Sequence, residues 1–259
     1  MIDSSEEKRR RARAGVLIAF VAVLLVLVVA LFFLAFFQFP KILDESIGVE
    51  LPFEPAPAAI VERPPSPDIV RGTLVFVIDD AGNSLCELEP FLEFPGDLTI
   101  AVLPGLSDSV EAARRIRAAG KEVFLHQPME AIGGQDTGPG AIMAGMGRDE
   151  IREIINRNLD EIWPVTGMNN HQGSLVTMDE EAMEVILELS RERGIRFLDS
   201  RTTNETVAPR VAEHLGMVIG QRDVFIDNIP DRESIMAQIN IGLDMAEQRG
   251  SSIMIGHAW

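Results

Sequence analysis

With 259 residues, 46% hydrophobic and 24% charged, the chain is long enough for one membrane segment, a linker and one domain of barrel size. Its net charge is −17, and the residues from Thr73 onward carry 15 Lys and Arg against 31 Asp and Glu. A domain this acidic is poorly suited to binding nucleic acid or an anionic lipid surface. The single cysteine, Cys86, excludes an internal disulfide, and we expect it to be a small buried apolar residue.

The N-terminal region predicts a membrane anchor. Residues 1–14 are polar and basic, and Gly15–Phe37 follows without a single charge. As a helix this run would span ~35 Å, which covers a hydrocarbon core of ~30 Å. A signal peptide is the alternative, but its apolar region would be only ~7–15 residues long and would end in small residues, whereas Leu31–Phe39 is bulky.

We therefore expect an uncleaved, single-pass anchor at residues 15–37, with the basic tail in the cytoplasm. The rest of the chain would then lie outside, which in a Gram-negative bacterium means anchoring in the inner membrane with the C-terminal domain in the periplasm. Residues 38–72 hold seven of the 15 prolines, so they predict an extended, semi-rigid spacer before a domain at 73–259.

Strand-like and helix-like segments alternate through that domain. The strand candidates are Leu74–Ile78, Leu98–Leu103, Glu122–Leu125, Val165–Met168, Ile195–Leu198, Val224–Ile226 (or Met217–Ile219) and Ser252–Ile255. The helix candidates are 108–119, 149–162 with five apolar residues on one face, a helix capped by Thr177 and Glu180 that ends at Arg193, 205–215, and 231–249. This order predicts βαβ units in an α/β fold, and seven strands suit a small or incomplete βα barrel better than an open sheet.

The first strand candidate, read as LVFVIDD from Leu74 to Asp80, runs straight into two adjacent carboxylates. Five apolar residues in a row are typical of a strand buried on both faces, so Asp79 and Asp80 are expected just past its C-terminal end. The two charges repel, and a metal would relieve that repulsion. The alternative is a simple turn, because Asp-Ala-Gly favours one.

Polar residues follow most of the other strand candidates as well. They are Asp79 and Asp80 after the first, His126 after the third, Asn169, Asn170 and His171 at the fourth, Asp199 and Ser200 after the fifth, Arg222, Asp223 and Asp227 around the sixth, and His257 after the seventh. Three of the four histidines therefore stand at strand C-termini, which converge on one rim in a βα barrel. Asn170, Asp199, Arg222 and Asp223 are candidates for binding substrate at that rim.

Histidines and a carboxylate that face one another are typical of a catalytic zinc-type site, with three N/O ligands and one open position. Asp80, His126 and His171 supply such a set, and Asp79 and His257 remain as base and acid. Each histidine alone could be a hydrogen-bonded core residue, but the three together favour a site. The fourth, His214, lies inside a helix pattern, where we expect a structural or solvated role.

Three other features are weaker signals. Glu130 stands four residues after His126 and is either a further ligand or, the interpretation we favour, a cap or partner within its loop. The glycine-rich stretch 133–147 does not match a phosphate-binding motif, so it is interpreted as a mobile loop over the rim. The sequence gives no support for catalysis by a nucleophilic side chain, because GxSxG is absent and Cys86 has no adjacent base.

Six motifs in order, LVFVIDDAG, VFLHQPMEA with GPGAIMAGM, GMNNHQGS, FLDSRTT, QRDVFIDN and IMIGHAW, resemble the divergent polysaccharide deacetylases of bacterial envelopes. The resemblance spans about residues 73–259 and implies a distorted seven-stranded βα barrel related to the NodB-like carbohydrate esterases. It implies that Asp79 is the general base, Asp80 and His126 are metal ligands, and His257 is the acid. The wider group carries His-x-x-x-His, and this chain has Glu130 at the second position, so His171 is inferred as the second metal histidine.

The sequence thus predicts a membrane-anchored hydrolase that uses a divalent metal, expected to be zinc, to remove N-acetyl groups from an envelope glycan. The alternative from another class is a catalytically silent glycan-binding or scaffold protein of the envelope. A third possibility is a metal-dependent hydrolase of another ester or of a phosphoester. In the wider group the domain continues past the position of Trp259, so the last helix of the barrel is expected to be missing.

Overall fold

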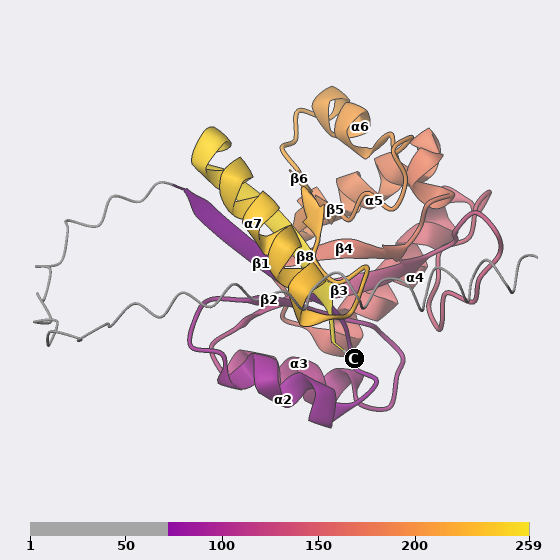
Figure 1. The fold of residues 1–259 in the computed structure, drawn as a ribbon. Coiled ribbons are helices and arrows are strands. Elements are labelled where there is room, and N and C mark those ends of the chain that lie inside the picture. The colour runs from indigo at the N-terminus through magenta and orange to yellow at the C-terminus, as the bar shows by residue number, and fades with distance from the viewer. Residues whose placement is uncertain (1–71, 259) are drawn as a thin grey trace, which may run out of the picture. The chain divides into compact units, whose positions relative to one another are not determined.

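The computed structural model describes residues 72–258, which form an α/β domain (Figure 1). The predicted basic tail, the predicted anchor at 15–37 and all but the last residue of the predicted linker lie outside the described residues. Between residues 72 and 258, no helix combines the length and the apolar character that crossing a bilayer requires.

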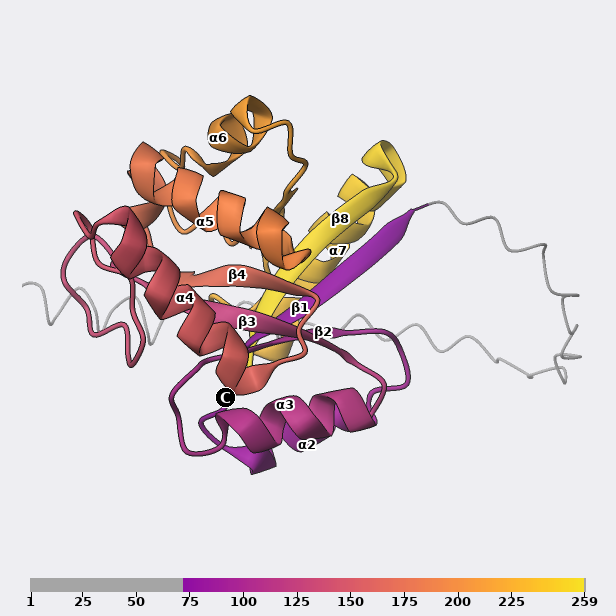
Figure 2. The ribbon, with the colours of Figure 1, turned by 180° about the vertical axis from the view of Figure 1, so that it is seen from behind.

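A half-barrel of eight parallel strands forms the centre of the domain, in the order β6-β5-β4-β3-β2-β1-β8-β7. The strands are β1 (Thr73–Ala81), β2 (Thr99–Val102), β3 (Glu122–Met129), β4 (Gly167–Gln172), β5 (Arg196–Asp199), β6 (Gly220–Gln221), β7 (Val224–Phe225) and β8 (Ser251–His257). The helices are α2 (Leu85–Glu93), α3 (Ser109–Ala118), α4 (Arg148–Ile162), α5 (Glu180–Arg193), α6 (Ala208–His214) and α7 (Arg232–Arg249), with a short 3₁₀ turn at Val176–Met178. Helix α7 packs on β8 and β1 (Figure 1), and the reverse view shows α4 and α5 in front of the other half of the sheet (Figure 2).

The alternation of strands and helices predicted from the sequence is confirmed, but several strands end later than predicted. β1, β3 and β4 continue to Ala81, Met129 and Gln172, so the acidic pair 79–80, His126 and His171 lie within strands rather than after them. The sixth strand also differs. It is split into two strands of two residues each, β6 paired with β5 and β7 paired with β8. Between them, the Arg222 amide donates to Asp199 O and the Asp223 amide donates to Ile253 O. The strand therefore changes partner halfway, which is why eight strands are present where seven were predicted, and Met217–Ile219 is not one of them.

Two local predictions about helices are wrong. The N-cap of α5 is Asp179, whose side chain accepts hydrogen bonds from the Glu181 and Ala182 amides, whereas Thr177 donates to Gly173 O instead. Cys86 is exposed on α2, because that helix buries Leu88 rather than its cysteine. The apolar face predicted for α4 is confirmed, since all five of its predicted residues are buried.

The two faces of the sheet carry separate apolar clusters. The larger one lies between the sheet and its helices and includes Ile78, Ile100 and Leu125. The smaller one fills the opposite, inner face and consists of Val77, Ala101, Phe124, Leu198 and Ile255. These inner residues alternate along their strands with residues of the outer cluster, as the two-residue period of a strand requires. They form an apolar floor at the inner face.

Candidate active site

The inner face continues from this apolar floor into a polar site. Asp79, His126 and His257 stand two residues beyond Val77, Phe124 and Ile255, so each points to the same inner face as the apolar residue before it. Strand register brings them close, because Asp79 pairs with His257 across β1 and β8. The site therefore lies at the C-terminal end of the parallel strands, where such folds place their reactive groups.

Asp79 and Asp80 are neighbours in sequence, so in a regular strand their side chains would point to opposite faces. The pairing of β1 with β2 shifts between Ile78 and Ala81, and Asp80 has a φ of 68°, in the left-handed region. An irregularity of this kind re-aims a side chain. It allows both carboxylates to serve one site, and aspartate is among the few residues that tolerate the conformation.

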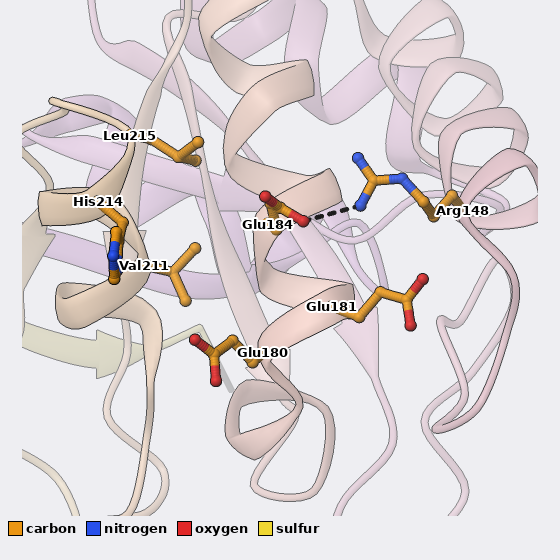
Figure 3. Close-up of a pocket in the computed structure, with 7 residues that line it drawn as sticks. All are labelled: Arg148, Glu180, Glu181, Glu184, Val211, His214 and Leu215. Atoms are coloured by element: carbon orange, nitrogen blue, oxygen red, sulfur yellow. Dashed lines mark hydrogen bonds and ion pairs between the residues drawn. The ribbon is translucent and has the colours of Figure 1, made fainter.

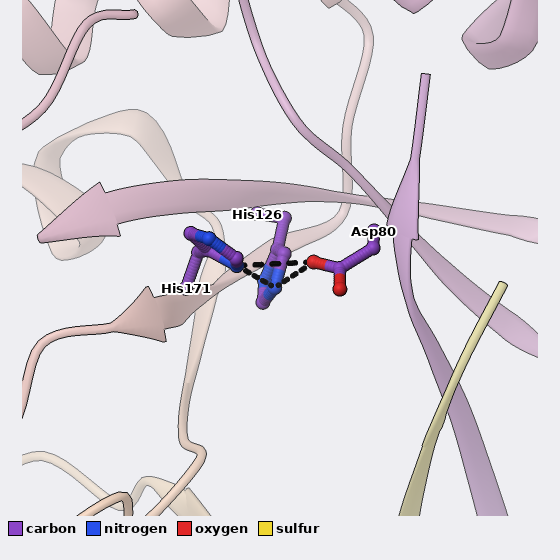
Figure 4. A group of neighbouring side chains, drawn as sticks. All are labelled: Asp80, His126 and His171. Carbon is purple, nitrogen blue, oxygen red and sulfur yellow. Dashed lines mark hydrogen bonds and ion pairs between the residues drawn. The ribbon is translucent and has the colours of Figure 1, made fainter. Parts of the chain in front are cut away.

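Asp80, His126 and His171 converge from β1, β3 and β4 (Figure 4). Asp80 Oδ1 lies 3.2 Å from His126 Nε2 and 3.0 Å from His171 Nδ1, and the two imidazole nitrogens are 3.2 Å apart. Although Asp80 Oδ1 is fully buried, it has no hydrogen-bond partner of acceptable geometry. One carboxylate oxygen and two ring nitrogens that face a common point fit a divalent cation such as zinc.

The titratable groups around this point change one another's pKa values. Burial raises the pKa of Asp79, although His126 and Asn169 oppose that effect. Burial alone would raise the pKa of Asp80, but the two imidazoles hold it well below its usual range. Burial alone would also lower the pKa of His126, but the charges of Asp79 and Asp80 raise it to about 9. A cation bound here would supply the positive charge beside Asp79 and Asp80 that the proton on His126 otherwise supplies.

His257 is held by Asp227, which the sequence did not single out for a role. Asp227 Oδ1 lies 3.0 Å from His257 Nδ1, and Asp227 Oδ2 accepts a hydrogen bond from the His257 amide. The ring stacks on Phe225 with 5.8 Å between centroids. Burial alone would lower the pKa of His257, but the bond with Asp227 raises it. An aspartate on Nδ1 favours the protonated ring, which can donate a proton from its other nitrogen.

Of the four residues predicted to bind substrate, Asn170 lines the cavity over the site. Its amide also accepts from Ser200 N and donates to Gln172 O. The other three have partners within the fold. Asp199 accepts from the Arg201 amide and the Thr206 hydroxyl, Arg222 donates to Ser200 O and Arg201 O, and Asp223 accepts from the Ile253 amide. Substrate contact by these residues stays a prediction.

Glu130 is a loop partner in this structure. Its Oε2 accepts a hydrogen bond from the Ala144 amide, and its own backbone bonds to Ile142. It is not part of the converging cluster formed by Asp80, His126 and His171. The glycine-rich loop is anchored as well, because Gln127 and Asn158 both donate to Gly140 O. The loop extends beside the site, where Asp136 and Pro139 line a cavity.

One cavity lies over the centre and a second adjoins it, and Asp80 and His171 line both of them. The first cavity, of about 190 Å³, is also lined by Ser200, Phe225 and His257. The second cavity, of about 270 Å³, is also lined by Leu103, Leu106 and the Asp136–Pro139 part of the glycine-rich loop. The centre thus has space for a bound molecule in two adjoining cavities.

A larger cavity of about 580 Å³ lies elsewhere, where α5, α6 and the start of α4 meet (Figure 3). It is lined by glutamates of α5, by Arg148 and by His214. Arg148 pairs with Glu184 at 3.0 Å, and His214 is exposed on α6. This is the structural or solvated position expected for His214, away from the converging cluster.

The sequence placed Asn169 and Asp227 among the polar residues at strand ends but assigned neither of them a role in the site. Asn169 is fully buried and contacts both Asp79 and His126. Its position two residues before His171 was a usable signal, because residues two apart on a strand share a face. The contact of Asp227 with His257 gave no such signal, since Asp227 lies beyond the end of β7 and reaches His257 through the packing of that segment against β8.

The fold and the site together define an α/β protein whose parallel strands present an Asp/His/His cluster beside a second buried carboxylate and a histidine–aspartate pair. The profile of the divergent polysaccharide deacetylases matches residues 76–259, and the chain belongs to that family. The resemblance seen in the six sequence motifs is thereby confirmed.

Similar proteins include the uncharacterised protein YibQ of Escherichia coli K12, which is 32% identical over 192 residues, 74% of this chain and 60% of that protein. An uncharacterised protein of Haemophilus influenzae is 28% identical over 72% of this chain and 67% of its own length. Among solved structures, an uncharacterised protein from Agrobacterium tumefaciens C58 has a TM-score of 0.69 at 23% identity, covering 73% of this chain and 78% of that one. That likeness supports the fold. The chain spans less than two thirds of the E. coli relative.

Proposed function

We propose that the protein is a zinc-dependent hydrolase that removes N-acetyl groups from a glycan of the bacterial envelope. The observation that carries this proposal is the convergence of Asp80, His126 and His171 next to the buried Asp79 and the paired His257. Membership of the divergent polysaccharide deacetylases supports a glycan as substrate and deacetylation as reaction.

In this proposal Asp80 Oδ1, His126 Nε2 and His171 Nδ1 hold the zinc, which supplies Lewis acidity toward the acetamide carbonyl and toward water. Asp79 accepts the proton of the attacking water, because its carboxylate is buried beside the cluster with Oδ2 3.6 Å from His126 Nε2. Burial raises the pKa of Asp79, which makes its carboxylate a stronger base. His257, fixed by Asp227, donates a proton to the departing amine.

The two cavities support a polymeric substrate. Both are lined by Asp80 and His171, so one acetamide can sit at the centre while a neighbouring sugar occupies the adjoining cavity. The charge of the domain supports a glycan rather than a nucleic acid, because a net −16 from Thr73 onward repels phosphate backbones.

The proposal places the domain in the periplasm, tethered to the inner membrane by residues 15–37. The support is the uncharged run itself and the basic residues before it, which favour a cytoplasmic N-terminus. The proline-rich residues 38–72 would then serve as a spacer that lets the site reach a glycan above the membrane.

The test is acetate release by the full-length chain in detergent, using N-acetylated oligosaccharides with added zinc, and a phosphoester as competing substrate. We expect acetate from the parent, no phosphate, and a loss of about 10²–10⁴-fold in Asp79→Asn because the base is gone. His214→Gln is the control and should match the parent. Phosphate release alone would favour a phosphoesterase, and binding of the oligosaccharide without turnover would favour a silent scaffold.

A further inference from the structure

Asn169 lies between the proposed base and a proposed metal ligand, with 0% of its surface exposed. Its Oδ1 is 2.9 Å from His126 Nδ1. Its Nδ2 donates to Asp79 Oδ1 at 2.8 Å and to the Ser200 hydroxyl at 3.2 Å. One amide therefore links β1, β3, β4 and the end of β5 at the bottom of the site.

The partners fix which way this amide points. A carboxylate only accepts hydrogen bonds, so the amide nitrogen must face Asp79 and the amide oxygen must face His126. His126 Nδ1 must then carry a hydrogen, because an amide oxygen cannot donate. The other ring nitrogen, Nε2, faces Asp80 Oδ1 at 3.2 Å. An outer hydrogen bond that fixes the tautomer and ring orientation of a ligand is a common part of metal sites.

We propose that Asn169 is a positioning residue that makes His126 Nε2 the metal-binding atom and that also orients the carboxylate of Asp79. This inference rests on the proposed function, since it assigns Asn169 a part in that same site. By holding Asp79 Oδ1, the amide leaves Oδ2 directed at the cluster, 3.6 Å from His126 Nε2. A carboxylate at position 169 could accept from His126 but would repel Asp79.

Because Asn169 contacts both His126 and Asp79, two substitutions should separate its effect on zinc binding from its effect on the base. Asn169→Leu removes the hydrogen bonds to His126 and Asp79, and we expect zinc affinity to fall about 10–100-fold. Asn169→Asp keeps the acceptor for His126, so zinc affinity should stay near that of the parent while acetate release is lost. The control is Asn158→Leu, because Asn158 is equally an internal amide, bonded to Gln127 and Gly140, and it contacts no ligand. It should lower stability and leave zinc affinity unchanged.

The measurements are zinc affinity by competition with a chromophoric chelator and ¹⁵N NMR of the full-length chain labelled at its four histidines. In the parent we expect a protected, hydrogen-bonded Nδ1–H of His126, which disappears in Asn169→Leu and persists in Asn158→Leu. Unchanged zinc affinity and an unchanged signal in Asn169→Leu would overturn the proposal. If the parent binds no zinc, the proposed function fails, and the Nδ1–H signal still decides whether Asn169 positions His126.

Discussion

Asp80 shows how a single backbone conformation creates this site. Its φ of 68° turns its carboxylate to the face that Asp79 already occupies. Most side chains are disfavoured in that region because Cβ approaches the following carbonyl, while aspartate and asparagine tolerate it. Position 80 is therefore constrained by its backbone conformation and, in the proposed function, by its role as a metal ligand.

The backbone constraint can be tested apart from the metal. In chelator-treated protein, Asp80→Val should lower the free energy of unfolding by about 1–3 kcal/mol more than Asp80→Asn, because a β-branched residue is strained at positive φ. Urea unfolding of the two variants measures this difference. Equal stability would show that the backbone at residue 80 is not strained.

His126 makes the stability of the metal-free protein depend on pH. Its pKa is raised to about 9, so protonation stabilises the folded state fully below pH ~6.5, and this contribution is lost as pH rises toward 9. The loss is expected to be roughly 3 kcal/mol and to diminish when zinc replaces the proton.

Urea unfolding at several pH values, with chelator or with zinc, tests this dependence. His214→Gln should show the same decline as the parent, because His214 lies away from the cluster. A metal-free protein equally stable at pH 6.5 and 9 would contradict the assignment.

At the scale of elements, strand register assembles the site more than any one motif does. His126 pairs with Asn169 across β3 and β4, and Asp79 pairs with His257 across β1 and β8. A shift of one residue in either pairing would turn reactive side chains to the outer face. The helices fix the strands by packing on that outer face, and α5 is among the most buried of them.

The observed cap of α5 gives a prediction at this scale. Asp179→Ala should destabilise the domain by about 1 kcal/mol, because two helix amides lose their acceptor. Glu180→Gln should have a smaller effect, since its exposed pair with Arg210 contributes little. Urea midpoints of both variants provide the comparison, and a larger loss for Glu180→Gln would favour the originally predicted cap.

At the scale of the whole molecule, the tether predicted at residues 15–37 would determine where the domain works. We expect the full-length chain to stay in the membrane fraction after alkaline carbonate extraction. Carbonate removes proteins that are held by electrostatic contacts, whereas a spanning helix is held by its apolar surface. Deletion of residues 1–39 should release the domain, with its zinc content unchanged. Release of the full-length chain by carbonate would contradict a spanning anchor.

Apolar runs in the sequence located the strands and so brought His126, His171 and His257 to one rim. They did not predict the strand ends, because β3 and β4 continue through the polar residues to Met129 and Gln172. The sequence could not reveal the irregularity at Asp80 or the split between β6 and β7, because both depend on which strand lies alongside. For the same reason the sequence could not predict the contact of Asp227 with His257, which forms between segments far apart in the chain. Cys86 was predicted as buried from its residue type alone, and the packing of α2 decided otherwise.

The most direct test of the account is the metal content of the full-length chain, measured by inductively coupled plasma mass spectrometry after dialysis against zinc. We expect one zinc per parent chain and per chain of the control Asp136→Asn, which changes a neighbouring carboxylate outside the converging cluster. Asp80→Asn and His126→Ala should lose it. A folded parent without bound metal, or variants that retain it, would contradict the claim that these three residues form a metal site.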